Sequence, residues 1–88
     1  MSEFDTKFSL QKKEELIQRL FTDKILPDFG LKIDRVSYED GCKVYFNNGG
    51  WIIARFSGTE PLLRIFCEME TMEEAKQMTN IWVKDLGL

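Results

Sequence analysis

Two short glycine-containing segments in the middle of the chain constrain its fold more than any other feature. Glu39-Asp40-Gly41 and residues 47–50, Asn-Asn-Gly-Gly, contain residues that tolerate positive φ angles and are typical of hairpin turns. They separate short runs rich in β-branched and aromatic residues, and turns this short join antiparallel neighbours. We therefore expect an antiparallel meander of four strands, at residues 32–38, 43–46, 51–56 and 63–69.

A helical periodicity precedes the expected strands. Ser9 is a suitable N-cap and Pro27 a suitable stop for a helix over residues 10–26. The apolar residues of this segment recur at helical spacing and predict one buried stripe, formed by Leu16, Ile17, Leu20 and Phe21 with Lys24 or Ile25. The residues before Ser9 show no clear periodicity, and we expect them to fray.

A second helix is expected after the strands. A Thr-x-x-Glu capping box begins at Thr71, and the helix is predicted to end at Gly87. Two amphipathic helices can bury their stripes together only on one face of the sheet. The predicted fold class is α+β: a single-domain two-layer sandwich over residues 1–88, in the order α-β-β-β-β-α, with two helices on one face of a four-stranded antiparallel sheet. The stripe of the second helix consists of Ala75, Met78, Trp82, Val83 and Leu86.

Composition excludes several classes of protein. A net charge of -3 disfavours broad nucleic-acid binding. No apolar run reaches the roughly 20 residues of a membrane span, and the start lacks a signal peptide, so we expect a cytoplasmic protein without a membrane or nucleic-acid partner. Without histidine, the chain cannot form Ser-His or Cys-His nucleophile pairs. Cys42 and Cys67 lack metal-site spacing, and we expect two reduced structural thiols and no metal site in this chain.

One decapeptide, from Arg55 to Arg64, has the chemistry of an anion site. Each guanidinium has a planar fork of donors that matches phosphate, and Ser57 and Thr59 each add a hydroxyl. Gly58 allows backbone N–H groups to approach an anion closely. These five residues are therefore our candidate phosphate ligands.

The expected hairpin places the two arginines opposite each other. If the strands around this loop pair symmetrically, Arg55 faces Arg64, and such like-charge pairs are unfavourable by up to ~1 kcal/mol. A shared dianion would remove this repulsion. We expect Pro61 to stiffen the loop, and Glu60 to hold the loop's shape rather than touch an anion that it would repel.

Simpler interpretations of these turn, arginine and aromatic residues remain open. Ser, Gly, Thr and Pro are ordinary turn residues, and arginines near a hairpin are often only solvated. Aromatic residues at these spacings usually belong to the core, which applies to Trp51, Phe56, Phe66 and Trp82. Trp51 also shares a strand face with Ile53 and Arg55, and an apolar patch on a face left open by the helices would dock another domain.

Residues 50–68 resemble a known family. This run contains the pattern R-x-S-G-T-E-P-x-x-R from Arg55 to Arg64 and is similar to the C-terminal domain of the α-D-phosphohexomutases, the phosphoglucomutase and phosphomannomutase family. The resemblance implies a TATA-binding-protein-like fold. It also implies that Arg55, Ser57, Thr59, Arg64 and the amide of Gly58 hold the phosphate that is not transferred. Phe56 stands where proline is common, and Phe66 where tyrosine is common.

The same resemblance implies that the steps of the reaction are distributed over several domains of a larger enzyme. In such enzymes a phosphoserine on another domain exchanges phosphoryl groups with the sugar through a bisphosphosugar, assisted by magnesium on a further domain. Neither the active-serine motif nor the Asp-Gly-Asp-Gly-Asp magnesium loop occurs here. We therefore expect no catalysis and no cofactor in this chain alone, only phosphosugar binding and cleft closure within a larger mutase. Which hexose phosphate is used stays open, and a stand-alone phosphate-binding or protein-interaction module using the open sheet face is the alternative.

Overall fold

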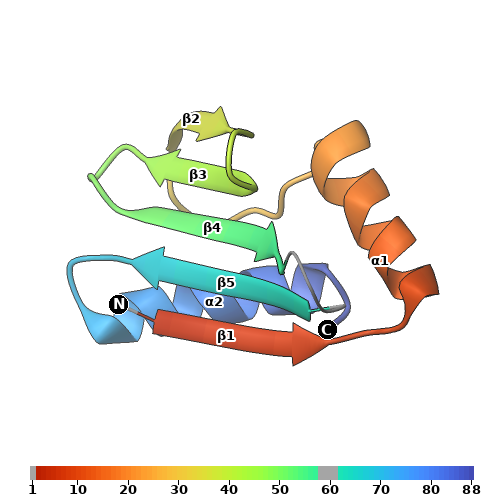
Figure 1. Ribbon diagram of the computed structural model, residues 1–88. Coiled ribbons are helices and arrows are strands. Elements are labelled where there is room, and N and C mark those ends of the chain that lie inside the picture. Colours follow the sequence, from red (N-terminus) through yellow and green to blue (C-terminus); the bar gives the residue numbers. More distant parts are fainter. Residues whose placement is uncertain (1, 58–61) are drawn as a thin grey trace.

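The computed structural model describes residues 2–57 and 62–88, which form one layer of sheet and one layer of helices (Figure 1). Along the chain, its elements are β1 (Ser2–Lys7), α1 (Leu10–Ile17), the π-helical segment η1 (Gln18–Thr22), β2 (Ile33–Ser37), β3 (Cys42–Phe46), β4 (Trp51–Phe56), β5 (Leu62–Glu68) and α2 (Met72–Asp85).

The sheet has five strands rather than the predicted four. Its order is β1-β5-β4-β3-β2, and every neighbouring pair is antiparallel. The four predicted strands form the expected meander. The predicted α-β-β-β-β-α order is wrong at its start, because residues expected to fray form β1 along the free edge of β5.

β1 has a weak signal in the sequence because it is a polar edge strand. Phe4 is its one large apolar residue, between the small polar Ser2 and Thr6. Its other face has the charged residues Glu3, Asp5 and Lys7, which discourage pairing with further strands. A six-residue strand with one apolar side chain gives too little hydrophobic alternation to stand out from a coil.

The first helix begins as predicted but ends early. The Ser9 hydroxyl accepts a hydrogen bond from the Lys12 amide at 3.2 Å, which confirms the N-cap. After Ile17 the helix widens into η1 and ends at Thr22, so the predicted extension to residue 26 is wrong. Leu16 and Leu20 of the predicted stripe are buried, whereas Ile17 and Ile25 are exposed.

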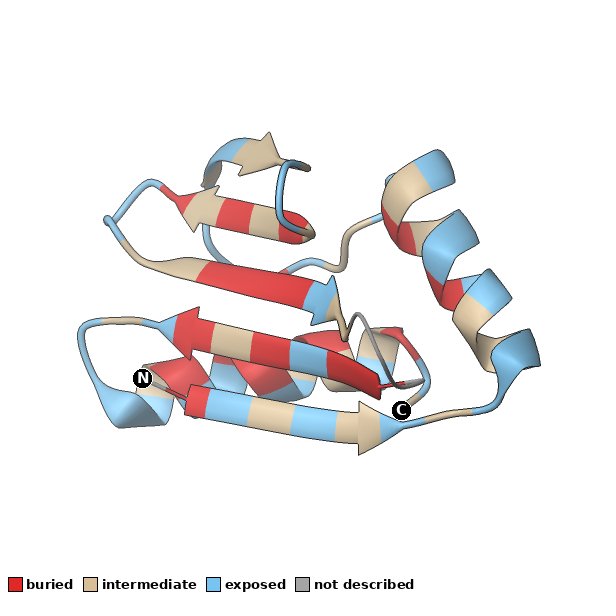
Figure 2. Ribbon diagram, in the orientation of Figure 1, coloured by how far each residue is buried: buried red, intermediate tan, exposed pale blue. Residues whose placement is uncertain are grey.

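The second helix follows the prediction closely. Thr71 caps it, since its hydroxyl accepts a hydrogen bond from the Glu74 amide at 3.1 Å. Side chains of α1, η1 and α2 join one core cluster with the same faces of β3, β4 and β5, so the helices cover one face of the sheet and leave the other open. Figure 2 shows the resulting alternation of buried and less buried residues along β5.

The two cysteines belong to this core. Cys42 and Cys67 are fully buried free thiols on β3 and β5. Burial raises the pKa of each thiol to about 11. Both side chains therefore act as small apolar core residues at neutral pH.

Candidate functional site

The candidate site lies where β4 ends and β5 begins. Arg55 pairs with Arg64 in the antiparallel register, as the sequence predicted. The amide of Ser57 donates a hydrogen bond to the Leu62 carbonyl at 2.9 Å, which extends the pairing beyond β4. Both arginines are exposed on the open face of the sheet, because their strand neighbours Ala54 and Ile65 point into the core.

β1 adds a carboxylate that sequence reasoning missed. Asp5 pairs with Arg64 in the register of β1 and β5, and its Oδ1 atom lies 3.8 Å from the Arg64 Nε atom. Both side chains are about half exposed, at 56% and 49%, so the ion pair is weak. The alternation of charged and uncharged residues along β1 was the only signal in the sequence for Asp5. That alternation identifies Asp5 as a neighbour of Arg64 only when the pairing of β1 with β5 is known.

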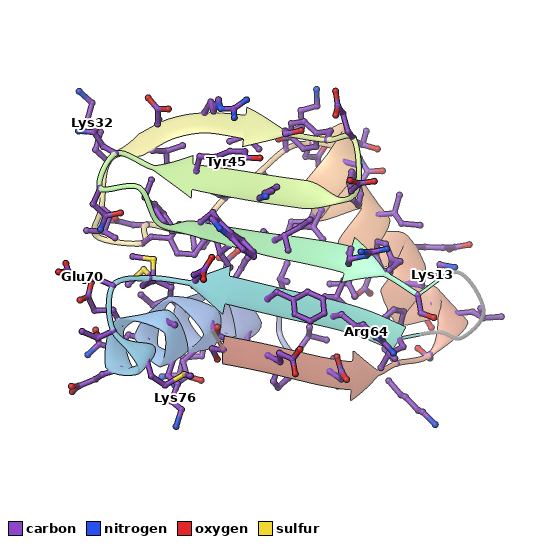
Figure 3. All side chains as sticks on the ribbon, turned by 60° about the vertical axis from the view of Figure 1, so that its left-hand side comes forward. Lys13, Lys32, Tyr45, Arg64, Glu70 and Lys76 are labelled. Carbon is purple, nitrogen blue, oxygen red and sulfur yellow. The ribbon has the colours of Figure 1, made fainter. Side chains whose placement is uncertain are left out.

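A hollow of about 220 Å³ opens beside the two arginines. Figure 3 shows Arg64 on the exposed face near the start of β5. Within the described residues, Arg55 has no carboxylate in ion-pair distance, and Arg64 has only the weak pair with Asp5. The hollow therefore combines two available guanidinium groups with a hydroxyl. Its lining consists of Arg55, Phe56, Ser57, Arg64 and Phe66.

Two larger hollows lack this chemistry. One, of about 410 Å³, lies between α1 and the C-terminal turn, and its only arginine, Arg19, is bound at 2.9 Å by Asp85. The other, of about 630 Å³, lies along α2 and has Lys84 as its one charged residue. Size alone would favour these two hollows, but the arginine pair distinguishes the smallest of the three as the candidate anion site.

Four predicted site residues fall outside the described part of the chain. They are Gly58, Thr59, Glu60 and Pro61, between the described ends at Ser57 and Leu62. Their roles as phosphate ligands or loop-shaping residues stay predictions. The structure brings together the remaining three candidates, Arg55, Ser57 and Arg64, around one hollow.

An aromatic surface continues from the site across the open face. Trp51 and Phe66 are partly buried and lie outside the core cluster, so the expectation that they are core residues is wrong, whereas the partly buried Phe56 packs against this cluster. Trp82 is fully buried, as expected. The Lys43 Nζ atom lies 4.4 Å from the ring centroid of Trp51 and 4.9 Å from that of Tyr45, which joins β3 to β4 through cation–π contacts.

Comparison with known proteins assigns the family. Residues 8–81 match the phosphoglucomutase/phosphomannomutase C-terminal domain family. The chain belongs to this family. The match includes α1, the meander and most of α2, but begins just after β1, so Asp5 lies outside the matched residues.

Curated members of the mutase family are similar to this chain over a small part of their own length. A phosphoglucomutase/phosphomannomutase from Thermococcus kodakarensis is 42% identical over 55 residues, which are 62% of this chain and 11% of that protein. A probable phosphoglucosamine mutase from Methanothermobacter thermautotrophicus is 32% identical over 66 residues, 75% of this chain and 14% of that protein. The chain thus spans only a small fraction of these relatives.

The described residues contain neither a membrane-spanning helix nor a cluster of metal-ligating side chains. None of their helices has the length and apolar character to cross a membrane. The same residues contain no cluster of three or more histidine, cysteine, aspartate or glutamate side chains suited to a metal ion.

Proposed function

We propose that this domain binds the non-transferred phosphate of a hexose phosphate and helps to close the active-site cleft of a phosphohexomutase. The observation that carries the proposal is the cross-strand pair of Arg55 and Arg64 beside Ser57, in a hollow of about 220 Å³. Two guanidinium groups and a hydroxyl supply enough donors for the oxygens of one phosphate. Membership of the family supports the same role.

Electrostatics favour a dianion at this place. Facing arginines repel each other, and the weak contact of Arg64 with Asp5 offsets only part of that repulsion. Asp5 approaches the Nε atom of Arg64, so the two terminal nitrogens stay available for a ligand. A phosphate monoester between the guanidinium groups would neutralise both.

The domain's contribution to the reaction is positional. Holding one phosphate fixes the distance of the other from the reacting groups, and closure around the sugar excludes water. We propose that the phosphoserine, the magnesium site and the groups that read the sugar hydroxyls belong to other domains of the mutase, since the chain spans 11% and 14% of two curated relatives. A TATA-binding-protein-like fold agrees with the meander and its one-sided helices.

A titration followed by amide NMR signals tests the proposal. Adding glucose 6-phosphate should shift the signals of Ser57 and Arg64, whereas glucose should leave them in place. Arg64→Gln should weaken binding roughly tenfold, because one charge-assisted contact contributes about 1.5 kcal/mol or more. Absence of shifts at millimolar glucose 6-phosphate would contradict the phosphate role.

A second candidate function rests on the aromatic surface of the open face. Trp51 and Phe66 remain partly exposed outside the core, as expected for a surface that docks a protein partner. Docking there should change the fluorescence of Trp51, measured in a Trp82→Phe background. Phosphosugar binding should instead shift the amide NMR signals of Ser57 and Arg64. The two candidate functions therefore predict different spectroscopic changes.

A further inference from the structure

Lys13 lies at the same end of the sheet as the arginine pair. Its Nζ atom is 5.9 Å from the ring centroid of Phe56, the last residue of β4. Figure 3 shows Lys13 and Arg64 at this end, from α1 and β5 respectively. Lys13 is partly buried, and no carboxylate of the described residues lies in ion-pair distance of it.

The ring of Phe56 connects Lys13 with the candidate site. Phe56 lines the hollow beside Arg55 and Ser57. The same ring contacts Phe8 edge-on at 5.8 Å, and Phe21 at 6.1 Å, which fixes the start of α1 and η1 against the end of β4. Phe56 therefore contributes to the lining of the hollow and also lies near the ammonium group of Lys13.

The position of Lys13 in its helix is electrostatically unfavourable without an anion. The first turn of α1 contains no acidic residue, although carboxylates are preferred at the positive end of a helix dipole. Lys12 is compensated by Glu15, whose Oε2 atom lies 3.6 Å from its Nζ atom. Lys13 has no such partner in the described residues, and a separation of 5.9 Å from Phe56 is near the limit of a cation–π contact.

We infer that Lys13 is a third cation of the phosphate site. This inference rests on the proposed function. Arg55 and Arg64 approach the ligand from the open face, and Lys13 extends past Phe56 from the helical face. Of these three cations, only Arg64 has a carboxylate of the described residues, Asp5, within ion-pair distance. Three positive charges and one negative charge leave two positive charges for a dianion.

The flexible lysine stem suits this role. Its four-carbon chain and compact ammonium group can leave a weak ring contact and follow an anion, whereas the arginines provide fixed planar donors. The ammonium acts mainly through charge, so its effect should fall with ionic strength. Lys13 should therefore strengthen binding most at low salt.

Binding of inorganic phosphate to the 88-residue chain, measured by amide NMR at low ionic strength, tests the inference. Lys13→Met keeps an apolar side chain but removes the charge, and should raise the Kd roughly threefold. Lys13→Arg should restore most of the affinity. Lys12→Met is the matched control, because Lys12 pairs with Glu15, and its Kd should equal that of the unmodified chain.

The outcomes separate this inference from the proposed function. If Arg64→Gln weakens phosphate binding and Lys13→Met does not, Lys13 is no part of the site, although the arginine pair binds phosphate. Equal losses in Lys12→Met and Lys13→Met would also overturn the inference, because they would indicate general attraction. If the unmodified chain binds no phosphate, the proposed function fails and the role of Lys13 fails with it.

Discussion

Arg64 has a like charge on one side and an opposite charge on the other. Arg55 pairs with it across β4, and Asp5 across β1. Because the unfavourable pair and the weak ion pair nearly cancel, Arg64→Gln should change the free energy of unfolding by less than about 0.5 kcal/mol. Urea unfolding measures this change. A loss above about 1.5 kcal/mol would assign Arg64 a structural role instead.

The sequence predicted which residues face each other only where two strands are joined by a single short loop. The symmetric loop was enough to place Arg55 opposite Arg64. The contacts of Asp5 with Arg64 and of Lys13 with Phe56 join segments far apart in the sequence, and no local pattern encodes them. They depend on where β1 and α1 pack, which side-chain packing of the whole molecule decides.

At the scale of elements, the turn between β2 and β3 supports the site directly. A Cβ atom on Gly41, whose φ is +131°, would lie 2.6 Å from the Ala54 carbonyl oxygen and 2.8 Å from the Arg55 Cβ atom. Gly41→Ala should therefore lower the free energy of unfolding by about 3 kcal/mol and weaken phosphate binding, since backbone strain and a clash with β4 add.

Gly49 provides the matched control for that turn. Its φ is +92°, but an added Cβ atom would meet nothing within 4 Å. Gly49→Ala should lower the free energy of unfolding by only about 1 kcal/mol, from strain alone, and leave phosphate binding unchanged. Urea unfolding of both variants compares the two values. Equal losses would mean that the close approach of Gly41 to Arg55 has no energetic consequence.

Strong local signals determined which elements could be predicted. Glycine turns placed the strands of the meander, and caps at Ser9 and Thr71 placed the helix starts. The end of the first helix could not be predicted, because a uniform helical period cannot represent the π-helical turn of η1. Arg19 of η1 donates two hydrogen bonds to Asp85, at 2.9 and 3.2 Å, so a long-range contact stabilises this departure.

At the scale of the whole molecule, the two buried thiols make folding sensitive to alkaline pH. Cys42 and Cys67 are fully buried on the helical face of the sheet, and burial raises both thiol pKa values from 9.0 to about 11. Between these values the folded chain keeps both protons while the unfolded chain loses them. Since the unfolded state then binds fewer protons, the free energy of unfolding must fall as the pH rises.

We expect this fall to begin near pH 9 and to continue to about pH 11, with a slope of up to ~1.4 kcal/mol per pH unit for each thiol. Urea unfolding at a series of pH values measures the slope. A Cys42→Ala, Cys67→Ala double variant is the control: its cavities lower stability at every pH, but they do not titrate. The slope of its unfolding free energy against pH should therefore be shallower over the same range. Equal slopes would show that the thiols ionise alike in the folded and unfolded chain, and that the core around β3 and β5 admits water.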